Sequence, residues 1–270
     1  MIIYILVLIC FLCTWIIYQK QIRILCKPKT KHTLTTPTIV SYNIQKFLWS
    51  CKSFKTIRQF LSQHSIILLQ ECYDETLESL DAVFPEYYIC RGTMKGLSMI
   101  HGGLAILSTY PIISYEYIPF IHYNPLTFDR LTEKGFLIVT IDVDGKKLNV
   151  INTHLQSSDY ERYDHYAFMQ FKELLEYVVI LQDAYIIGGD FNIDITDLKK
   201  RHQINLYYPL DPTIYMNLKT GHSVNKKERG YEGFIFDYFI TKDVSLDPEM
   251  VPHTYSDHNP VRSLIKLAHR

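Results

Sequence analysis

The sequence has no excess of charge of either sign, because 28 lysine and arginine residues balance 28 aspartate and glutamate residues. A neutral chain sets up no global field that would attract nucleic acid or an anionic membrane. A local basic patch is still compatible with this balance, so it argues only weakly against a nuclease. The chain of 270 residues also lacks internal repeats and changes composition only near its N-terminus, which favours one large folded domain.

Cysteine is scarce and poorly placed for a disulfide framework or a metal site. Three of the six cysteines lie within the first 26 residues, and the others are Cys51, Cys72 and Cys90. An odd number without metal-ligand spacing predicts neither kind of site. The sequence also lacks Asn-x-Ser/Thr acceptor sites, a nucleophile elbow and a Cys–His signature. It therefore gives no support to a serine or cysteine hydrolase with a covalent intermediate.

Residues 1–19 contain no charged side chain and consist mainly of aliphatic and aromatic residues. As a helix, about 19 residues span roughly 28 Å, close to the thickness of a bilayer's hydrocarbon core. No basic residue precedes the run and no small-residue cleavage site follows it, which favours an uncleaved transmembrane anchor over a signal peptide. Basic residues flank its C-terminal side, so we predict a single-pass membrane protein whose folded domain faces the cytoplasm.

Residues 20–37 predict a basic linker between this anchor and the folded domain. They are rich in lysine and threonine and contain Pro28 and Pro37, which disfavour a long helix or a central strand. Fully extended, about 18 residues reach roughly 60 Å. The folded domain then comprises residues 38–270.

Short apolar runs dominate the folded part. They predict strands near residues 38–42, 66–69, 104–107, 136–141, 148–151, 185–187 and 234–240. Helical spacing of apolar residues predicts helices at residues 54–61, 77–84 and 171–178, with Asp74 as an N-cap of the second. Asp144-Gly145 between two strands is a hairpin signal, which excludes a purely parallel sheet. This pattern favours an α+β fold in which two stacked sheets are covered by outer helices.

Polar side chains suited to metal or phosphate chemistry follow several of these apolar runs. They are Asn43, Glu71, His154, Asp190 with Asn192, and Asp237. If the strand ends meet at one rim, these groups converge on one cleft. A rigid sheet can hold such groups to the tolerance that catalysis requires.

Glu71 is a candidate Mg²⁺ ligand, because Mg²⁺ takes oxygen ligands and is often held by one or two carboxylates. Other divalent cations are equally compatible, and a strand-end carboxylate that caps a turn is the structural alternative. Asn43 would supply an amide oxygen to the metal or contact phosphate, or it is an ordinary turn residue. Asp190 and Asn192 point the same way if the chain stays extended. We then expect Asp190 to orient a water molecule and Asn192 to hold a phosphoryl oxygen, with a plain Gly-Gly-Asp turn as the alternative.

Two histidines are candidates for proton transfer. His258 is distinguished by the adjacent Asp257 and by the Pro260 that follows. A carboxylate bonded to one ring nitrogen fixes the tautomer and raises basicity, and either Asp257 or Asp237 would serve. We therefore predict His258 as the general base and His154 as a donor to the phosphoryl oxygen.

The motifs occur in a fixed order: Ser41-Tyr42-Asn43, Gln70-Glu71, residues 102–108, Thr153-His154, Gly189-Asp190-Phe191-Asn192, Phe236-Asp237-Tyr238 and Ser256-Asp257-His258. This ordered set resembles the endonuclease/exonuclease/phosphatase superfamily over roughly residues 38–267. The resemblance implies a DNase I-like fold, a four-layer α/β/β/α sandwich with two central sheets.

Within the superfamily the sequence is most similar to the neutral sphingomyelinases, through residues 134–139, 153–158 and 170–174. The resemblance implies Mg²⁺-dependent cleavage of sphingomyelin to ceramide and phosphocholine. By position, the resemblance implies that Glu71 and Asn43 bind the metal and that His154 and Asn192 contact the phosphate. It also implies that Asp190 orients the water and that His258 is the general base. Phe191 departs from the methionine that those enzymes often have, and residues 206–233 match no pattern.

A membrane anchor favours a lipid substrate, because a tethered site meets the bilayer at high effective concentration. Tyr117, Phe120, Tyr123 and Phe128 would form an aromatic rim for a choline head group, with ordinary packing as the alternative. A nuclease or another phosphodiesterase or phosphatase of the superfamily is the second hypothesis. A non-enzymatic membrane adaptor is the third, and the complete set of catalytic residue types argues against it.

Overall fold

The computed structural model describes residues 25–28, 30, 36–46, 53–73, 77–95, 98–125, 127–157, 165–194 and 235–267. The predicted anchor at residues 1–19, the N-cap Asp74 and the whole of the unmatched segment 206–233 lie outside these ranges. Across the described ranges, no helix is both long enough and apolar enough to cross a membrane. The transmembrane anchor therefore stays a prediction.

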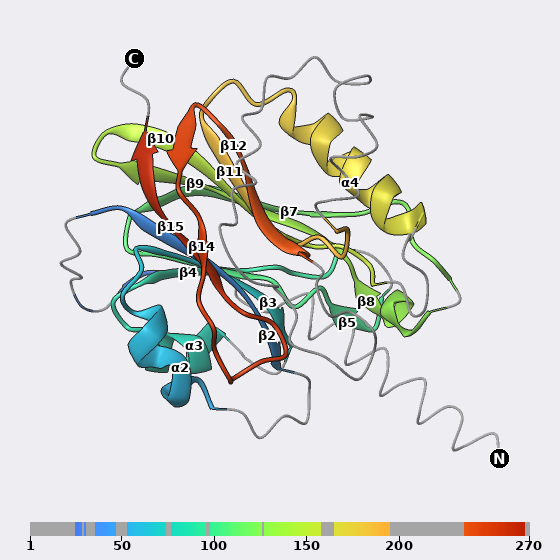
Figure 1. Cartoon of the computed structure of the whole chain (residues 1–270), viewed down its shortest axis with the longest axis horizontal. Helices are drawn as coiled ribbons and strands as arrows, with labels where there is room; N and C mark the ends of the chain where they lie inside the picture. The colour runs from blue at the N-terminus through green and yellow to red at the C-terminus, as the bar shows by residue number, and fades with distance from the viewer. Residues whose placement is uncertain are drawn as a thin grey trace.

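The larger sheet has eight strands and is mostly antiparallel (Figure 1). Its order is β1 (Leu25–Cys26), β4 (Tyr88–Arg91), β6 (Ala105–Ser108), β3 (Ile66–Cys72), β2 (Thr38–Lys46), β15 (Val261–Leu267) and β13 (Val244–Leu246), with β14 (Glu249–Met250) also pairing with β15. Only β2 and β3 run parallel to each other. Because β1 pairs with β4, part of the predicted linker belongs to the edge of this sheet.

The smaller sheet has five strands. Its order is β12 (Asp237–Lys242), β11 (Tyr185–Asp190), β10 (Lys146–His154), β9 (Gly135–Val143) and β7 (Ile112–Pro119). β10 and β11 are parallel, and β9 joins β10 through the predicted hairpin, with φ values of 53° at Asp144 and 86° at Gly145. The 3₁₀ helix η1 (Phe128–Leu131) leads directly into β8 (Thr132–Glu133). This strand forms a short parallel pair with β5 (Ile100–His101).

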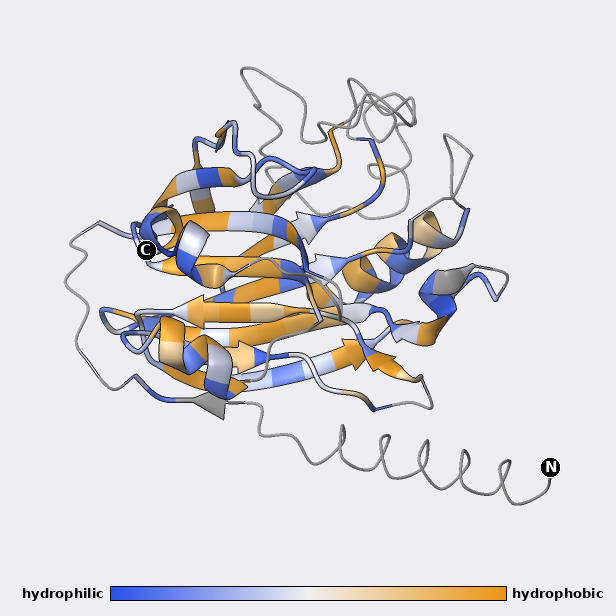
Figure 2. Cartoon of the chain, turned by 90° about the horizontal axis from the view of Figure 1, so that it is seen from below, coloured by the Kyte–Doolittle hydropathy of each residue, from blue (hydrophilic) through white to orange (hydrophobic). Residues whose placement is uncertain are grey.

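Three hydrophobic cores separate four layers. Between the sheets, Leu68 and Ile106 pack with Val139 and Ile186, which explains why these strands are apolar on both faces. Figure 2 shows the strands of both sheets coloured mainly as hydrophobic. The other two cores lie on the outer faces of the sheets.

The outer cores are closed by helices. Helix α2 (Phe54–Leu61) begins at Ser53, whose side chain accepts a hydrogen bond from Lys55 N. Together with α3 (Leu77–Val83) it covers the outer face of the larger sheet, and α4 (His165–Val178) covers the smaller sheet. The predicted α+β class and its arrangement of helices outside two sheets are therefore confirmed.

Strand direction explains how distant residues reach one rim. The parallel strands β2, β3, β10 and β11 end on the same side, and the antiparallel strands β12 and β15 begin there. Asp190, the last residue of β11, is therefore opposite Asp237, the first residue of β12. The prediction that an apolar strand ends at Asp237 was wrong, because that strand starts at this residue.

Candidate active site

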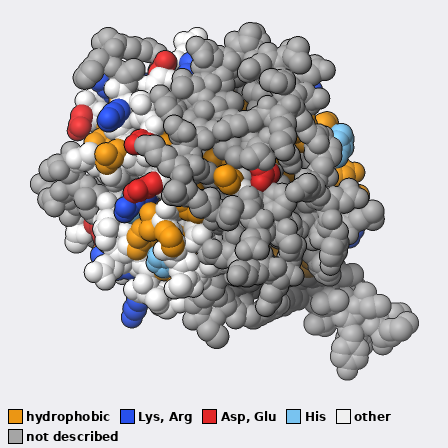
Figure 3. Space-filling model, in the orientation of Figure 1, with side chains coloured by type: hydrophobic (Ala, Val, Ile, Leu, Met, Phe, Trp, Pro, Cys, Tyr) orange, Lys and Arg blue, Asp and Glu red, His pale blue; other side chains and the backbone are white. Residues whose placement is uncertain are grey.

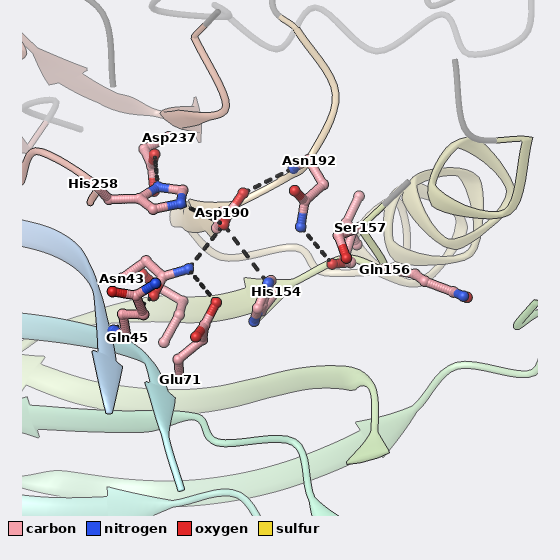
Figure 4. A network of polar contacts seen from close by, with 12 residues as sticks. Asn43, Gln45, Glu71, His154, Gln156, Ser157, Asp190, Asn192, Asp237 and His258 are labelled. Atoms are coloured by element: carbon pink, nitrogen blue, oxygen red, sulfur yellow. Dashed lines mark hydrogen bonds and ion pairs between the residues drawn. The ribbon is translucent and has the colours of Figure 1, made fainter. Parts of the chain in front are cut away.

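Asn43 links the two sheets at the rim. Its amide nitrogen donates to Glu71 Oε1 and to Asp190 Oδ2, both at 3.0 Å (Figure 4). Its amide oxygen accepts from Gln45 N at 3.0 Å, where φ of Gln45 is 48° and β2 carries an irregularity. The donor side of Asn43, rather than the predicted amide oxygen, therefore faces the carboxylates and offsets their mutual repulsion.

His258 is held between two carboxylates. Its Nδ1 lies 2.8 Å from Asp237 Oδ2, and its Nε2 lies 3.6 Å from Asp190 Oδ2 (Figure 4). Asp257 makes a hydrogen bond with Ser256 Oγ at 3.2 Å. Of the two carboxylates that the sequence left open, Asp237 is the one bonded to the ring, and Asp257 contributes only a weaker charge nearby.

His154 and Asn192 complete the cluster. His154 Nε2 lies 3.6 Å from Asp190 Oδ2, so the two imidazoles flank one carboxylate. Asn192 donates from Nδ2 to the carbonyl of Leu155 at 2.9 Å and from its backbone N to Asp190 Oδ1 at 2.9 Å. The chain turns at Asn192, where φ is 48°, so the side chains of Asp190 and Asn192 do not share the extended geometry that the sequence assumed.

Opposite pKa shifts distinguish the two histidines. Burial alone would lower the pKa of His258, but the charges of Asp237 and Asp190 outweigh it and raise the pKa to about 10. Burial and the positive charge of Lys134 lower the pKa of His154 to about 3. At neutral pH His154 is therefore a neutral imidazole, whereas His258 holds a proton shared with its carboxylates.

The carboxylates also differ. Burial raises the pKa of Glu71, although the Asn43 hydrogen bond and the charge of Lys134 oppose this effect. For Asp190 burial also acts upward, but the two histidines and Asn43 outweigh it and lower the pKa. Asp190 is therefore stable as an anion in this site, whereas Glu71 needs a further positive partner to stay ionised.

The donor set at Glu71 fits a hard divalent cation. Glu71 Oε2 is buried and accepts no hydrogen bond from the described residues. An orphaned buried carboxylate oxygen is costly unless a cation or a donor reaches it. Mg²⁺ prefers such oxygen ligands. Among described residues, Asp190, Asp237 and His258 also bring possible ligand atoms within 4.8 Å of one another, but both ring nitrogens of this histidine already face carboxylates. This geometry makes Glu71 a candidate cation ligand and the Asp237–His258 pair a candidate for proton transfer.

The sequence prediction did not identify a buried polar contact beneath the rim. Gln70 Nε2 donates to Asn152 Oδ1 at 2.6 Å and to Ser41 Oγ at 3.1 Å. Asn152 in turn donates to the carbonyls of Leu69 and Ala105. Gln70 and Asn152 adjoin the Glu71 and His154 motifs, so this contact fixes the spacing of the sheets directly behind the site. Their polarity within apolar strands was the available signal.

Lys134 is a second residue that the motif analysis gave no role. Its side chain is buried, and Nζ lies 3.6 Å from Asp129 Oδ2 and 3.5 Å from the carbonyl of Leu155. That carbonyl also accepts from Asn192. Lys134 thus places a fixed positive charge beside His154 and Glu71, on whose pKa values it acts.

Comparison with known proteins shows to which family this chain belongs. Residues 40–258 match the Endonuclease/Exonuclease/phosphatase family, and this stretch contains the whole cluster from Asn43 to His258. The chain belongs to the endonuclease/exonuclease/phosphatase family. It is 32% identical to a phospholipase C of Staphylococcus aureus over 202 residues, which cover 61% of this chain and 60% of that protein. It is 27% identical to a sphingomyelinase C of Bacillus cereus over 191 residues, covering 61% and 56% of the two chains.

Solved structures of other proteins share the fold. A beta toxin variant from Staphylococcus aureus with bound magnesium ions matches with a TM-score of 0.62 at 21% identity, covering 85% of this chain and 99% of that one. D. rerio TDP2 in complex with a single-strand DNA product matches equally well, with a TM-score of 0.62 at 16% identity and 86% and 99% coverage. At these identities the likeness shows the fold alone, and it includes one structure with bound magnesium ions and one with a DNA product.

Proposed function

We propose that this family member is a Mg²⁺-dependent phosphoric diester hydrolase that acts on a membrane phospholipid. One observation carries the proposal: the rim joins a buried carboxylate suited to a cation with a carboxylate–imidazole pair suited to proton transfer. Glu71 supplies the first and Asp237–His258 the second, and Asp190 and Asn43 connect them. A binding module or adaptor would have no need for this combination.

The residues divide the reaction between them. In its deprotonated form, His258 takes the proton of the attacking water, and Asp237 holds its ring in one tautomer. His154, neutral because of its lowered pKa, donates a hydrogen bond to the phosphoryl oxygen where negative charge develops. Asp190 orients the water, and Asn192 is the further candidate for phosphate contact. A cation held by Glu71, with Asn43 beside it, would offset charge on the phosphoryl and leaving oxygens.

Sphingomyelin is the substrate that we favour, giving ceramide and phosphocholine. The relatives named phospholipase C and sphingomyelinase C support this choice. The loop after β7 also exposes Ile121 and Tyr123, which are 79% and 57% accessible and suit contact with a lipid surface. We further propose that residues 1–19 anchor the protein and that the catalytic domain lies on the cytoplasmic side, as the flanking basic residues predict.

A nuclease or another phosphodiesterase of the family is the second candidate, since the fold also matches a DNA-bound structure. Nucleic-acid binding requires a basic surface that follows the phosphate backbone. In Figure 3, basic and acidic side chains are interspersed on the described part of the visible face. No continuous basic strip is visible on this described part of the face, and we rank the nuclease second.

A paired assay tests the two candidates. The full-length chain is incubated with sphingomyelin vesicles and, separately, with plasmid DNA, in Mg²⁺ or in EDTA. We expect phosphocholine release in Mg²⁺ only and no nicking of the plasmid, whereas nicking alone would favour the nuclease. Glu71→Ala should lower the activity by roughly 10³-fold, because a catalytic cation contributes several kcal/mol. Glu176→Ala, which removes an exposed carboxylate on α4, is the control and should retain activity.

A further inference from the structure

His258, the candidate base, lies on a loop rather than on a strand. The loop comprises residues 251–260 and joins β14 to β15. Val251 N donates to the carbonyl of Pro260 at 2.9 Å, which closes the base of the loop. Loops are more mobile than strands, whereas a general base must stay within hydrogen-bond reach of the proton that it takes. A contact that fixes this loop to the sheet therefore contributes to catalysis.

His253 holds the loop together on both sides of His258. Its backbone N donates to Asn259 Oδ1 at 3.0 Å, and its Nδ1 accepts from Tyr255 N at 3.2 Å. Asn259 is the residue after the base and is buried, whereas Tyr255 precedes the base. One side chain thus bonds to both flanks of the catalytic histidine, and the mechanism above gives it no role.

Tyr42 connects this histidine to the larger sheet. Its hydroxyl lies 3.2 Å from His253 Nδ1, and the two rings meet edge-on with their centroids 5.7 Å apart. Tyr42 is fully buried in the outer core of β2 and α2, beside which the loop runs (Figure 1). Successive residues of a strand point to opposite faces, so Asn43 reaches Glu71 and Asp190 while Tyr42 reaches the loop. The end of β2 is thus tied to the carboxylates on one face and to the base loop on the other.

The contacts of His253 fix its tautomer. The backbone N–H of Tyr255 can only donate, so Nδ1 must be an unprotonated acceptor and the ring proton lies on Nε2. Burial raises the pKa of Tyr42, so its hydroxyl keeps its hydrogen, and the backbone of Ser256 bonds to the same hydroxyl. A protonated His253 has no acceptor at Nδ1. It would leave both the tyrosine hydroxyl and the loop amide without their partner.

The surroundings favour the neutral form of this ring. His253 packs on Phe60 of α2 with their centroids 5.3 Å apart, and burial lowers its pKa. Phe60 also packs on His64, which burial keeps neutral down to about pH 4. The titratable groups around the ring come from its own loop, from β2 and from the end of α2: Tyr255, Asp257, Tyr42 and His64. At neutral pH, His253 is therefore an acceptor.

We propose that His253 is a positioning residue for the general base, and that as a neutral imidazole it fixes the loop of His258 to Tyr42 of β2. The inference rests on the proposed function and concerns how its base is held. His253 acts through the loop and not on the reacting atoms. Its loss should therefore lower kcat more than it raises KM, because His154 and Asn192 lie on other elements and still contact the phosphate.

Substitution of His253 tests the kinetic consequence. His253→Leu keeps an apolar side chain on Phe60 but offers no acceptor, whereas His253→Asn places an amide oxygen near the position of Nδ1. With sphingomyelin vesicles in Mg²⁺ at about pH 8, kcat should fall about tenfold in His253→Leu, with KM within about twofold. It should return to within about threefold of wild type in His253→Asn. Thr254→Ala, at an exposed residue of the same loop, is the control and should match wild type.

Acid distinguishes an acceptor from a packing residue. Because burial lowers the pKa of His253, its contact is intact above the ordinary histidine range and is lost only at lower pH. Between about pH 8 and about pH 5, wild type should lose kcat through both His258 and His253, whereas His253→Asn, which cannot titrate, loses it through His258 alone. His253→Asn should therefore become the faster enzyme at the acid end. Parallel pH profiles, or an undiminished kcat in His253→Leu, would overturn the inference.

Hydrogen exchange across residues 251–260 of the full-length chain tests the contact without catalysis, and urea denaturation verifies that each variant folds. The Tyr255 amide should exchange about tenfold faster in His253→Leu than in wild type, and at nearly the wild-type rate in His253→Asn. Equal exchange in all three proteins would overturn the inference even if sphingomyelin is cleaved. Faster exchange in the leucine variant, restored by asparagine, in a chain that cleaves neither sphingomyelin nor DNA would establish the contact and refute the proposed hydrolase.

Discussion

At the scale of single residues, the site depends on which carboxylate holds His258. Asp257 is its neighbour in sequence, yet the ring is bonded to Asp237, 21 residues away. Neighbouring side chains on an extended chain point to opposite sides, so adjacency does not predict contact. The identity of the candidate base was predictable from the sequence. Its partner required knowledge of where β12 begins.

Asp237→Asn should lower kcat/KM by about 10²-fold or more, because it loses the acceptor that orients the imidazole and fixes its tautomer. The carboxylates raise the pKa of His258 to about 10. In the wild type, the fraction of His258 in the neutral, basic form should therefore increase with pH, and the rate should increase with it. Loss of the Asp237 charge lowers this pKa and moves the rise to lower pH. The pH profile of kcat/KM measures both effects.

Asp257→Asn is the matched control for this prediction, since it removes a nearby carboxylate that is not bonded to the ring. It should cost less than about tenfold and shift the profile only slightly. If it costs more than Asp237→Asn, the assignment of the orienting carboxylate is wrong.

At the scale of elements, the sequence predicted strands where consecutive residues are apolar and missed those where only one face is covered. The runs buried on both faces became β2, β3, β9, β10 and β11. β7 was not predicted, because four of its eight residues are exposed at the sheet edge. In β15, the alternate residues Val261, Ser263 and Ile265 are buried. The alternation of apolar and polar residues is hard to see in the sequence, because a serine is buried and Leu264 is exposed. Burial on one face leaves a weaker signal than burial on both.

From the sequence, Gly188-Gly189 could be recognised as a place where the backbone approaches another segment closely. The sequence could not identify that segment. A Cβ on Gly189 would meet Thr153 O of β10 at 2.0 Å, and φ there is 149°. Any side chain must therefore push β11 away from β10, directly before Asp190. The same pair of strands carries His154, so this glycine sets the distance between two site residues.

Gly189→Ala should destabilise the fold by about 2–4 kcal/mol, since the clash is with backbone and the conformation is strained for an L-residue. Urea denaturation measures the loss of unfolding free energy. Gly145→Ala is the control: its φ is 86°, but a Cβ there meets nothing within 4 Å. It should cost about 1 kcal/mol, the conformational term alone. Equal losses for the two variants would refute the steric explanation.

At the scale of the whole molecule, the two stacked sheets bury polar groups as well as apolar ones. The four-layer arrangement follows from the number and apolarity of the strands, and the sequence predicted it. The charge states of the histidines that the layers enclose were not predicted, because periodicity does not reveal the protonation of a buried side chain. His64, between α2 and β3, is buried with its Nδ1 3.3 Å from the carbonyl of Leu61. It precedes the first residue of β3, whereas Glu71 lies near the last residue of that strand, so it allows a test of folding without involving the site.

Acidification should destabilise the protein through His64. Burial lowers its pKa from 6.5 to about 4, so between these values the unfolded chain binds a proton that the native state does not. The stability is therefore fully present above pH 6.5 and is lost as the pH falls towards 4. One proton corresponds to about 1.4 kcal/mol per pH unit, or roughly 3 kcal/mol over this interval. Urea denaturation at pH 6.5, 5.5 and 4.5 gives the slope.

His64→Asn retains a side-chain nitrogen near the carbonyl of Leu61 but cannot titrate in this range, so its slope of unfolding free energy against pH should be smaller by about one proton. Gln63→Ala changes the same turn without altering any titratable group and should keep the wild-type slope. A wild-type slope in His64→Asn would mean that the native state accepts the proton as readily as the unfolded chain. Burial in the layered fold would then not be holding this imidazole neutral, contrary to the lowered pKa on which the prediction rests.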